Sequence, residues 1–187
     1  MPDIIILAGP NGAGKSTLAP HLLRDAFGIV EYVNADTIAQ GLSAYAPETA
    51  AIEAGRVMLR RLRALAKERR DFALETTLAT RFYLKWISEL QSSRYNVHLV
   101  FLWLNSAELA IERVAERVRL GGHDVPEETI RRRYDRGLIN FLHLYRPMVD
   151  SWQVFDASEE FPIEVAIGGK IDGSMTINET LWQMIEK

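Results

Sequence analysis

The stretch Ile4-Ile5-Ile6-Leu7-Ala8-Gly9-Pro10-Asn11-Gly12-Ala13-Gly14-Lys15-Ser16-Thr17 decides how this chain folds. Its first four residues form an apolar run rich in β-branched side chains, which predicts a strand covered on both faces. The segment Gly9–Ser16 then fits the pattern G-x-x-x-x-G-K-[ST], and a helix is expected to begin at Gly14 or Lys15. A strand, a glycine loop and a helix in this order indicate a phosphate-binding (Walker A) loop.

The loop suits a nucleoside triphosphate because glycines let main-chain N–H groups approach phosphate oxygens closely. The free N–H groups and the positive dipole end of the helix strengthen that field. We expect Lys15 to contact the β- and γ-phosphates, Ser16 to hold Mg²⁺ through its hydroxyl, and Thr17 to contact the α-phosphate. The predicted residues for binding ATP or GTP are Gly9, Asn11, Gly12, Ala13, Gly14, Lys15, Ser16 and Thr17.

Composition excludes several classes of protein. The chain has 187 residues, of which 48% are hydrophobic and 25% charged, and this size favours a single domain over residues 1–187. It has no cysteine, which excludes a disulfide scaffold, a thiol nucleophile and a thiolate zinc site. The formal net charge of -3 gives no global basic field and disfavours nucleic acid as a partner. No run reaches the roughly 20 apolar residues of a membrane span, and no signal peptide is recognised, so we expect a cytoplasmic protein.

Further short apolar runs follow the first strand, and longer helical stretches separate them. These runs are Ile29–Val33, Phe72–Leu74, Val97–Leu104 and Trp152–Phe155. The alternation predicts a three-layer α/β fold around a central, mostly parallel sheet of about five strands. Residues Ile163–Ile177, with turns at Gly168-Gly169 and Asp172-Gly173, predict a hairpin-like appendix before a last short helix.

Five longer helices are expected between these strands. They begin at Gly14 or Lys15, near Pro47, near Arg81, near Ala107 and at Asp124, the last with Pro126 in its first turn. The first is expected to run to Phe27, with Gly28 as its stop. Asp124 and Glu127 have the spacing of a capping box for the fifth. We expect residues 106–146 to form a helical lid, with Gly121-Gly122-His123 as its hinge.

Two acidic residues follow predicted strands, at the edge where an open α/β sheet binds its ligands. Asp36 follows the second strand, and Glu75 ends the third. A phosphotransferase needs a carboxylate to orient an acceptor hydroxyl and accept its proton, and Asp36 is our candidate base. Asp36 is also a candidate N-cap for a helix beginning near Thr37. Glu75 is expected to contact acceptor hydroxyls or a magnesium-bound water, with Thr76 as a further polar contact.

Arginines on two predicted helices are candidates for neutralising phosphate charge, since the guanidinium offers a planar fork of donors. Arg117 flanks the apolar face of the helix from Ala107, and Arg133 flanks that of the next helix. We therefore predict Arg117 and Arg133 as phosphate contacts, with Arg113 and Arg132 in reserve. A further basic stripe begins at Arg56 and is most simply a solvated helix face.

The sequence lacks the motifs of two other classes of nucleotide-binding protein. It has no Asn-Lys-x-Asp motif of the kind that GTPases use to read guanine. The apolar run Val97–Leu104 ends in Asn105-Ser106 instead of the Asp-Glu pair expected of a motor ATPase. Both absences favour a small-molecule kinase.

The sequence resembles the zeta-toxin-like P-loop kinases, particularly their short stand-alone bacterial members. The likeness lies in Ala8–Thr17, Asn34–Ala39, Glu75–Leu78 and Arg113–Phe141. It implies a nucleotide-kinase-like α/β fold, ATP and Mg²⁺ as cofactors, and transfer of the γ-phosphate to a sugar hydroxyl of a UDP-N-acetyl amino sugar. It also implies that Asp36 is the base, Lys15 the phosphate-loop lysine and Glu75 the substrate-binding acid. The paired lid arginines of the family fall on Arg117 and Arg133, and its toxins have protein antitoxins as partners.

We therefore expect an ATP-dependent phosphotransferase that acts on a hydroxyl of a small metabolite, first of all a UDP-N-acetyl amino sugar. Asp36, Lys15, Arg117 and Arg133 are the predicted catalytic residues, Asp36, Glu75 and Thr76 the predicted substrate contacts, and Ser16 the predicted metal ligand. Two alternatives stay open. One is an ATP-binding module that regulates a partner by slow hydrolysis, and the other is a kinase of polynucleotide ends.

Overall fold

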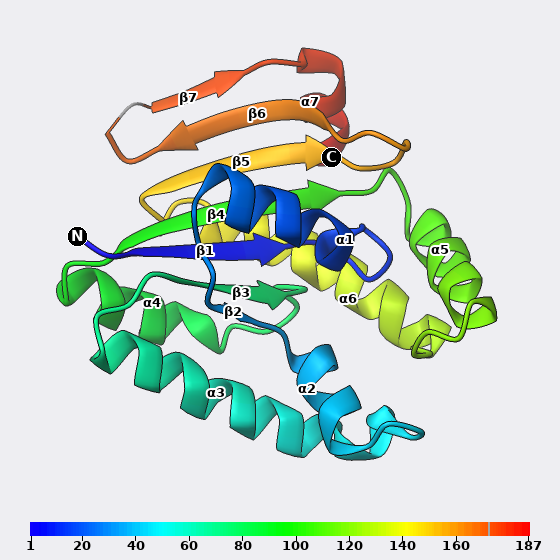
Figure 1. Ribbon diagram of the computed structural model, residues 1–187. Coiled ribbons are helices and arrows are strands. Elements are labelled where there is room, and N and C mark those ends of the chain that lie inside the picture. The colour runs from blue at the N-terminus through cyan, green and yellow to red at the C-terminus, as the bar shows by residue number, and fades with distance from the viewer. Residues whose placement is uncertain (172) are drawn as a thin grey trace.

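A computed structural model describes residues 1–171 and 173–187 and contains one seven-stranded sheet with the order β2-β3-β1-β4-β5-β6-β7 (Figure 1). The first five strands in chain order pair in parallel, and the last two pair antiparallel with their neighbours. The strands are β1 (Asp3–Ala8), β2 (Tyr32–Val33), β3 (Phe72–Thr76), β4 (Asn96–Trp103), β5 (Ser151–Asp156), β6 (Ile163–Gly169) and β7 (Gly173–Thr176).

The strand register brings the carboxyl ends of β1, β2 and β3 to one edge. Ala8 at the end of β1 pairs with Thr76, and Val33 at the end of β2 pairs with Leu74. The segments that follow these strands therefore leave the sheet at the same level. Because β1 lies in the interior of the sheet, the glycine loop after it is flanked by the ends of its neighbours.

Helices cover both faces of the sheet, which confirms the predicted three-layer class (Figure 1). Alternate residues of β1 face opposite ways: Ile4 and Ile6 belong to one core, and Ile5 and Leu7 to the other. The helices are α1 (Lys15–Ala19), α2 (Ala35–Leu42), α3 (Ala51–Lys67), α4 (Tyr83–Ser92), α5 (Ala107–Arg119), α6 (Glu127–Asn140) and α7 (Glu179–Ile185). Within the described residues, none of them is long and apolar enough to cross a membrane.

The sheet is larger than the predicted five strands because the hairpin of β6 and β7 pairs with β5 and extends the sheet. The hairpin was expected, but Gly168 and Gly169, predicted as a turn, are the last two residues of β6. The other predicted turn, Asp172-Gly173, includes Asp172, which lies outside the described residues. The second strand is also shorter than the predicted Ile29–Val33, since only Tyr32 and Val33 pair with β3.

One predicted helix interior and one predicted helix start differ from the structure. The helix from Lys15 changes at Pro20 into a π-helical turn, η1 (Pro20–Ala26), because proline has no N–H for the regular ladder. Gly28, at φ +67°, follows that turn as the predicted stop. The capping box of Asp124 is wrong, since Pro126 is the N-cap of α6 and no side chain caps this helix.

Helix α6 passes from one core to the other across the edge where the strands end. Ile130 and Tyr134 pack in the core beneath α1, whereas Leu138 near the end of α6, and Phe141 directly after it, pack in the opposite core. The Tyr134 hydroxyl donates to the carbonyl of Leu104, directly after β4, at 2.6 Å. This path brings the middle of α6 over the ends of the central strands.

The loop after β3 is fixed to α6 by two contacts. The Asn140 side-chain amide donates to the carbonyl of Leu78 at 2.7 Å. Gly137 lies so close to the Thr77 carbonyl that a β-carbon there would overlap it. Leu78 has φ +54° and is fully buried, so the surrounding packing holds an unfavourable backbone conformation. The ends of β3 and α6 therefore form one rigid unit.

We predict that Gly137→Ala lowers the free energy of unfolding by about 1–3 kcal/mol, because the new methyl group forces α6 away from the Thr77 carbonyl. Urea unfolding followed by circular dichroism measures this loss. Gly55→Ala is the matched control, because Gly55 lies inside α3 with no atom within 4 Å of a β-carbon. This control is expected to gain about 0.5–1 kcal/mol. Equal effects of the two substitutions on stability would contradict the close contact between Gly137 and the Thr77 carbonyl.

Candidate functional site

The glycine loop lies directly between β1 and α1, as predicted. Gly9 has φ +144°, and a β-carbon on it would overlap the carbonyl of Leu102 in β4. Gly14 has φ +78° and is the residue from which α1 begins. The loop therefore turns back tightly against the sheet at Gly9 and presents the first turn of a helix after Gly14, as a phosphate cradle requires.

Lys15 is buried, with 5% of its surface exposed. Its ammonium group donates to the carbonyl oxygens of Gly9 at 3.0 Å and Pro10 at 2.8 Å. The Glu75 carboxylate lies 3.7 Å from the same nitrogen. Burial lowers the pKa of Lys15, and the negative charges of Glu75 and Asp36 oppose that shift. These two carboxylates therefore help a buried lysine to keep its charge.

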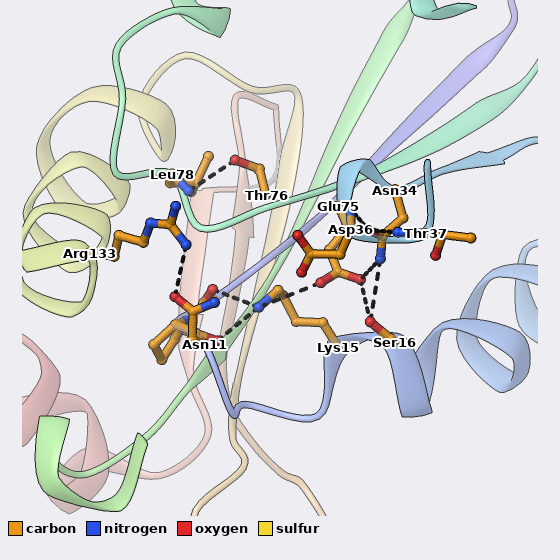
Figure 2. Close-up of polar contacts among 12 residues, drawn as sticks. Asn11, Lys15, Ser16, Asn34, Asp36, Thr37, Glu75, Thr76, Leu78 and Arg133 are labelled. Atoms are coloured by element: carbon orange, nitrogen blue, oxygen red, sulfur yellow. Dashed lines mark hydrogen bonds and ion pairs between the residues drawn. The ribbon is translucent and has the colours of Figure 1, made fainter. Parts of the chain in front are cut away.

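Glu75 is the centre of a polar cluster that Figure 2 shows beside the start of α1. One carboxylate oxygen, Oε2, accepts hydrogen bonds from the Ser16 hydroxyl at 2.9 Å, the Asn34 amide at 2.8 Å and the Tyr32 hydroxyl. Burial raises the pKa of Tyr32, and the charge of Glu75 raises it further. The other oxygen, Oε1, faces Lys15. The predicted members Lys15, Ser16 and Glu75 are thus brought together.

Asp36 lies in the first turn of α2 and is exposed. The alternative that Asp36 caps this helix is wrong, because the Asn34 side chain accepts from the N–H groups of Asp36 and Thr37. The negative charge of Asp36 raises the pKa of both Lys15 and Arg133 against the effect of their burial. Figure 2 shows its carboxylate turned toward the middle of the site, between Lys15 and Arg133. Its position leaves it available to a substrate hydroxyl.

The site offers oxygen ligands that suit Mg²⁺. The Ser16 hydroxyl and the Glu75 carboxylate meet at 2.9 Å, and hard oxygen donors are what this ion prefers. No group of three or more acidic or histidine side chains gathers around a common point in the described residues.

Of the two predicted phosphate-binding arginines, Arg133 contacts the glycine loop, whereas Arg117 contacts the connection between α5 and α6. Arg133 on α6 donates to the Asn11 side chain at 3.5 Å, and burial lowers its pKa. Arg117 on α5 donates to the carbonyl of His123 at 2.7 Å, and its charge lowers the pKa of Lys15. The Arg117 Nε is buried and has no hydrogen-bond partner within the part of the chain that the structure describes. Arg133 therefore brings positive charge to the loop, and the charge of Arg117 is near enough to affect Lys15.

The other predicted contacts lie outside this cluster. Arg113 donates to the carbonyl oxygens of Ala157 and Ser158, both at 2.6 Å, and so joins α5 to the segment after β5. Arg132 is exposed on α6. The Thr76 hydroxyl accepts from the Leu78 N–H at 3.1 Å and so stabilises the turn after β3. Substrate contact by Thr76 stays a prediction.

Sequence reasoning missed Asn34 and Tyr32, which contact Glu75 and Ser16. Two signals were present. Tyr32 and Asn34 are two residues apart at the end of a strand, so their side chains share one face. Asn34 also precedes a helix, where asparagine is a preferred N-cap. Neither signal shows that the face points at Glu75, which depends on the pairing of β2 with β3.

Comparisons with known proteins agree with this geometry. Residues 4–136 match the family described as an AAA domain. An uncharacterised protein of Haemophilus influenzae is 32% identical over 130 residues, which are 70% of this chain and 91% of that protein. The chain belongs to the AAA domain family.

Solved structures extend the comparison beyond the matched region of this AAA domain. A chain of the AvrRxo1-ORF1:AvrRxo1-ORF2 complex superposes with a TM-score of 0.78 at 16% identity over 99% of this chain. The present chain spans 63% of the length of that chain. The same complex with ATP gives a TM-score of 0.77. A structure from the PezAT toxin–antitoxin system of Streptococcus pneumoniae gives 0.68 at 18% identity, over 98% of this chain and 78% of that one.

At these identities the likeness is one of fold. It confirms a P-loop kinase-like α/β fold for this AAA domain, and it agrees with the resemblance to zeta-toxin-like kinases that the sequence predicts.

We predict that Glu75→Gln lowers the pKa of Lys15 further, because the substitution removes the nearest negative charge that opposes burial. Acylation of Lys15, followed by mass spectrometry between pH 6 and about pH 10, should therefore begin at lower pH in the variant. Glu68→Gln is the matched control, since Glu68 is exposed at the end of α3. An unchanged Lys15 profile in Glu75→Gln would contradict the coupling.

Proposed function

We propose that this protein transfers the γ-phosphate of ATP to a hydroxyl group of a small metabolite. The observation that carries the proposal is the meeting of Lys15, Ser16, Glu75 and Asp36 at one edge of the sheet. A phosphate-binding loop alone occurs in proteins with many different functions. The Asp36 carboxylate, which has no hydrogen-bond partner among the residues that the structure describes, adds what an acceptor hydroxyl needs.

Each residue has a defined part in this reaction. Lys15 leaves the carbonyl oxygens of Gly9 and Pro10 and binds the β- and γ-phosphates. Arg117 and Arg133 neutralise the charge that spreads over the migrating phosphoryl group. Ser16 would hold Mg²⁺ through its hydroxyl, and Glu75, hydrogen-bonded to that hydroxyl, would contact the acceptor or the water around the ion. The bound ion supplies charge neutralisation to the phosphates.

Asp36 acts on the acceptor. The acceptor oxygen attacks the γ-phosphorus as the bond from the bridging oxygen to that phosphorus breaks, and ADP leaves with the electron pair. The proton of the acceptor hydroxyl passes to the Asp36 carboxylate. The half-buried Arg133 lies close enough to Asp36 for their opposite charges to attract each other.

The acceptor that the family resemblance favours is a UDP-N-acetyl amino sugar. The same resemblance supports a protein antitoxin as partner, and the fold likeness to structures of toxin–antitoxin and ORF1:ORF2 complexes agrees with it. The net charge of -3 continues to disfavour polynucleotide ends as acceptors.

We predict that Asp36→Asn lowers the rate of phosphate transfer by about 100-fold or more, because the general base is lost. Its affinity for ATP should stay within about twofold, since the phosphate cradle is intact. Lys15→Ala should weaken ATP binding by about tenfold or more, through the loss of a charge-assisted contact. Calorimetry measures the binding, and release of ADP measures the rate.

Asp25→Asn is the matched control for Asp36, because Asp25 is exposed and contacts only His21 on its own helical turn. It should behave as the wild type. Turnover by Asp36→Asn at the wild-type rate would remove the role of Asp36 as base.

We predict that γ-labelled ATP and Mg²⁺ label a nucleotide sugar in a panel that also holds free sugars, DNA ends and RNA ends. Mass spectrometry should show the gain of one phosphate on a UDP-N-acetyl amino sugar. Label on polynucleotide ends alone would support the polynucleotide kinase instead. ATP turnover that depends on a protein partner, with no labelled product, would support a regulatory module.

A further inference from the structure

Asn34 is a buried polar residue between β2 and α2, with 6% of its surface exposed. Its side-chain oxygen accepts from the Asp36 N–H at 2.7 Å and from the Thr37 N–H at 3.3 Å. These are two of the N–H groups that the first turn of a helix leaves without a partner. This oxygen therefore fixes the turn that carries Asp36.

The nitrogen of the same amide points the other way, toward the end of β3. It donates to Glu75 Oε2 at 2.8 Å, and the Tyr32 hydroxyl at 3.2 Å and the Ser16 hydroxyl at 3.4 Å are also within reach. The shortest of these contacts goes to the charged acceptor, as expected for a charge-assisted hydrogen bond. This nitrogen therefore fixes the carboxylate that faces Lys15.

The surroundings admit only one orientation of the amide. The opposite orientation would point the oxygen at the Glu75 carboxylate and the NH₂ group at two main-chain N–H donors. Because the amide is planar and both of its ends are bonded, the first turn of α2 and the Glu75 carboxylate cannot move independently.

We propose that Asn34 is a positioning residue for phosphoryl transfer, which holds the base Asp36 and the carboxylate Glu75 in a fixed relation. The inference rests on the proposed function. It adds a residue that touches neither the phosphates nor the acceptor and acts through the two that do. Catalysis is sensitive to such placement, since a displacement of about 1 Å can lower a rate about 100-fold.

Other polar residues serve only one of the two contacts. Serine caps a helix about as well as asparagine, but its hydroxyl is too short to reach Glu75 as well. Aspartate also caps well, but it has no N–H group and places a second negative charge against Glu75. The dual contact therefore specifies asparagine at this position.

The first test separates positioning from simple capping. We expect Asn34→Ser to lower kcat for ATP turnover, measured as release of ADP, by about tenfold or more. KM for ATP should stay within about twofold, because the contacts of Lys15 with the carbonyl oxygens of Gly9 and Pro10 do not involve Asn34. The matched control is Asn178→Ser, since Asn178 caps α7 by accepting from the Leu181 N–H at 3.1 Å. The control should keep the wild-type kcat.

The second test measures the contact between Asn34 and Glu75 directly and needs no acceptor substrate. Asn34→Asp should lower the midpoint of urea unfolding, because two carboxylates then meet in a buried place. Adding Glu75→Gln should raise the midpoint back toward the wild-type value, since the new amide can donate to the new carboxylate. Adding Glu68→Gln instead should leave the midpoint low.

A wild-type kcat in Asn34→Ser, or an Asn34→Asp midpoint that Glu75→Gln does not raise, would overturn the inference. A separate measurement, ATP turnover by the wild-type protein, tests the proposed function. A wild-type protein that turns over no ATP, with or without acceptors, contradicts the function. The unfolding midpoints would then still decide whether Asn34 joins Glu75 to α2.

Discussion

A buried ammonium group is the constraint on which the rest of the site depends. Lys15 is held beneath the glycine loop, where only carbonyl oxygens and the carboxylates of Glu75 and Asp36 offset the loss of water. These partners come from three different strand ends, so the register of β1, β2 and β3 has to be correct for the lysine to keep its charge. The pairing of these strands therefore determines the electrostatic environment of Lys15.

The helices complete this arrangement from the other side. α6 crosses the edge of the sheet, is fixed to the loop after β3 by Asn140, and carries Arg133 to the Asn11 side chain. α5 brings Arg117 to the turn at His123. The positive charge of Arg133 on α6 is opposed by the negative charge of Asp36 after β2. The motion of residues 106–146 as a lid stays a prediction.

The sequence predicted the parts of the site that depend on local patterns. The glycine loop, the start of α1 at Lys15 and the strand that ends at Glu75 follow from spacing over a few residues. Helical periodicity also selected Arg117 and Arg133, because both flank the apolar faces that pack against the sheet.

Features that depend on distant contacts were not predictable. The roles of Asn34 and Tyr32 arise only when β2 pairs with β3. The path of α6 depends on the contact of Gly137 with Thr77, sixty residues earlier in the chain. The hairpin near the end was expected, but its pairing with β5 depends on the exposed edge of a sheet that the hairpin itself does not encode. The capping box predicted at Asp124 does not form, because α6 begins after Pro126, which is its N-cap.

The most direct test of the account is a crystal structure with Mn²⁺ and a non-hydrolysable ATP analogue, in which anomalous scattering locates the metal. The account predicts that the Lys15 ammonium leaves the carbonyl oxygens of Gly9 and Pro10 for the β- and γ-phosphates. The metal should lie against the Ser16 hydroxyl on the side of Glu75, with the Asp36 carboxylate open to the γ-phosphate. A nucleotide bound elsewhere, or an Asp36 carboxylate turned away from the γ-phosphate, would contradict it.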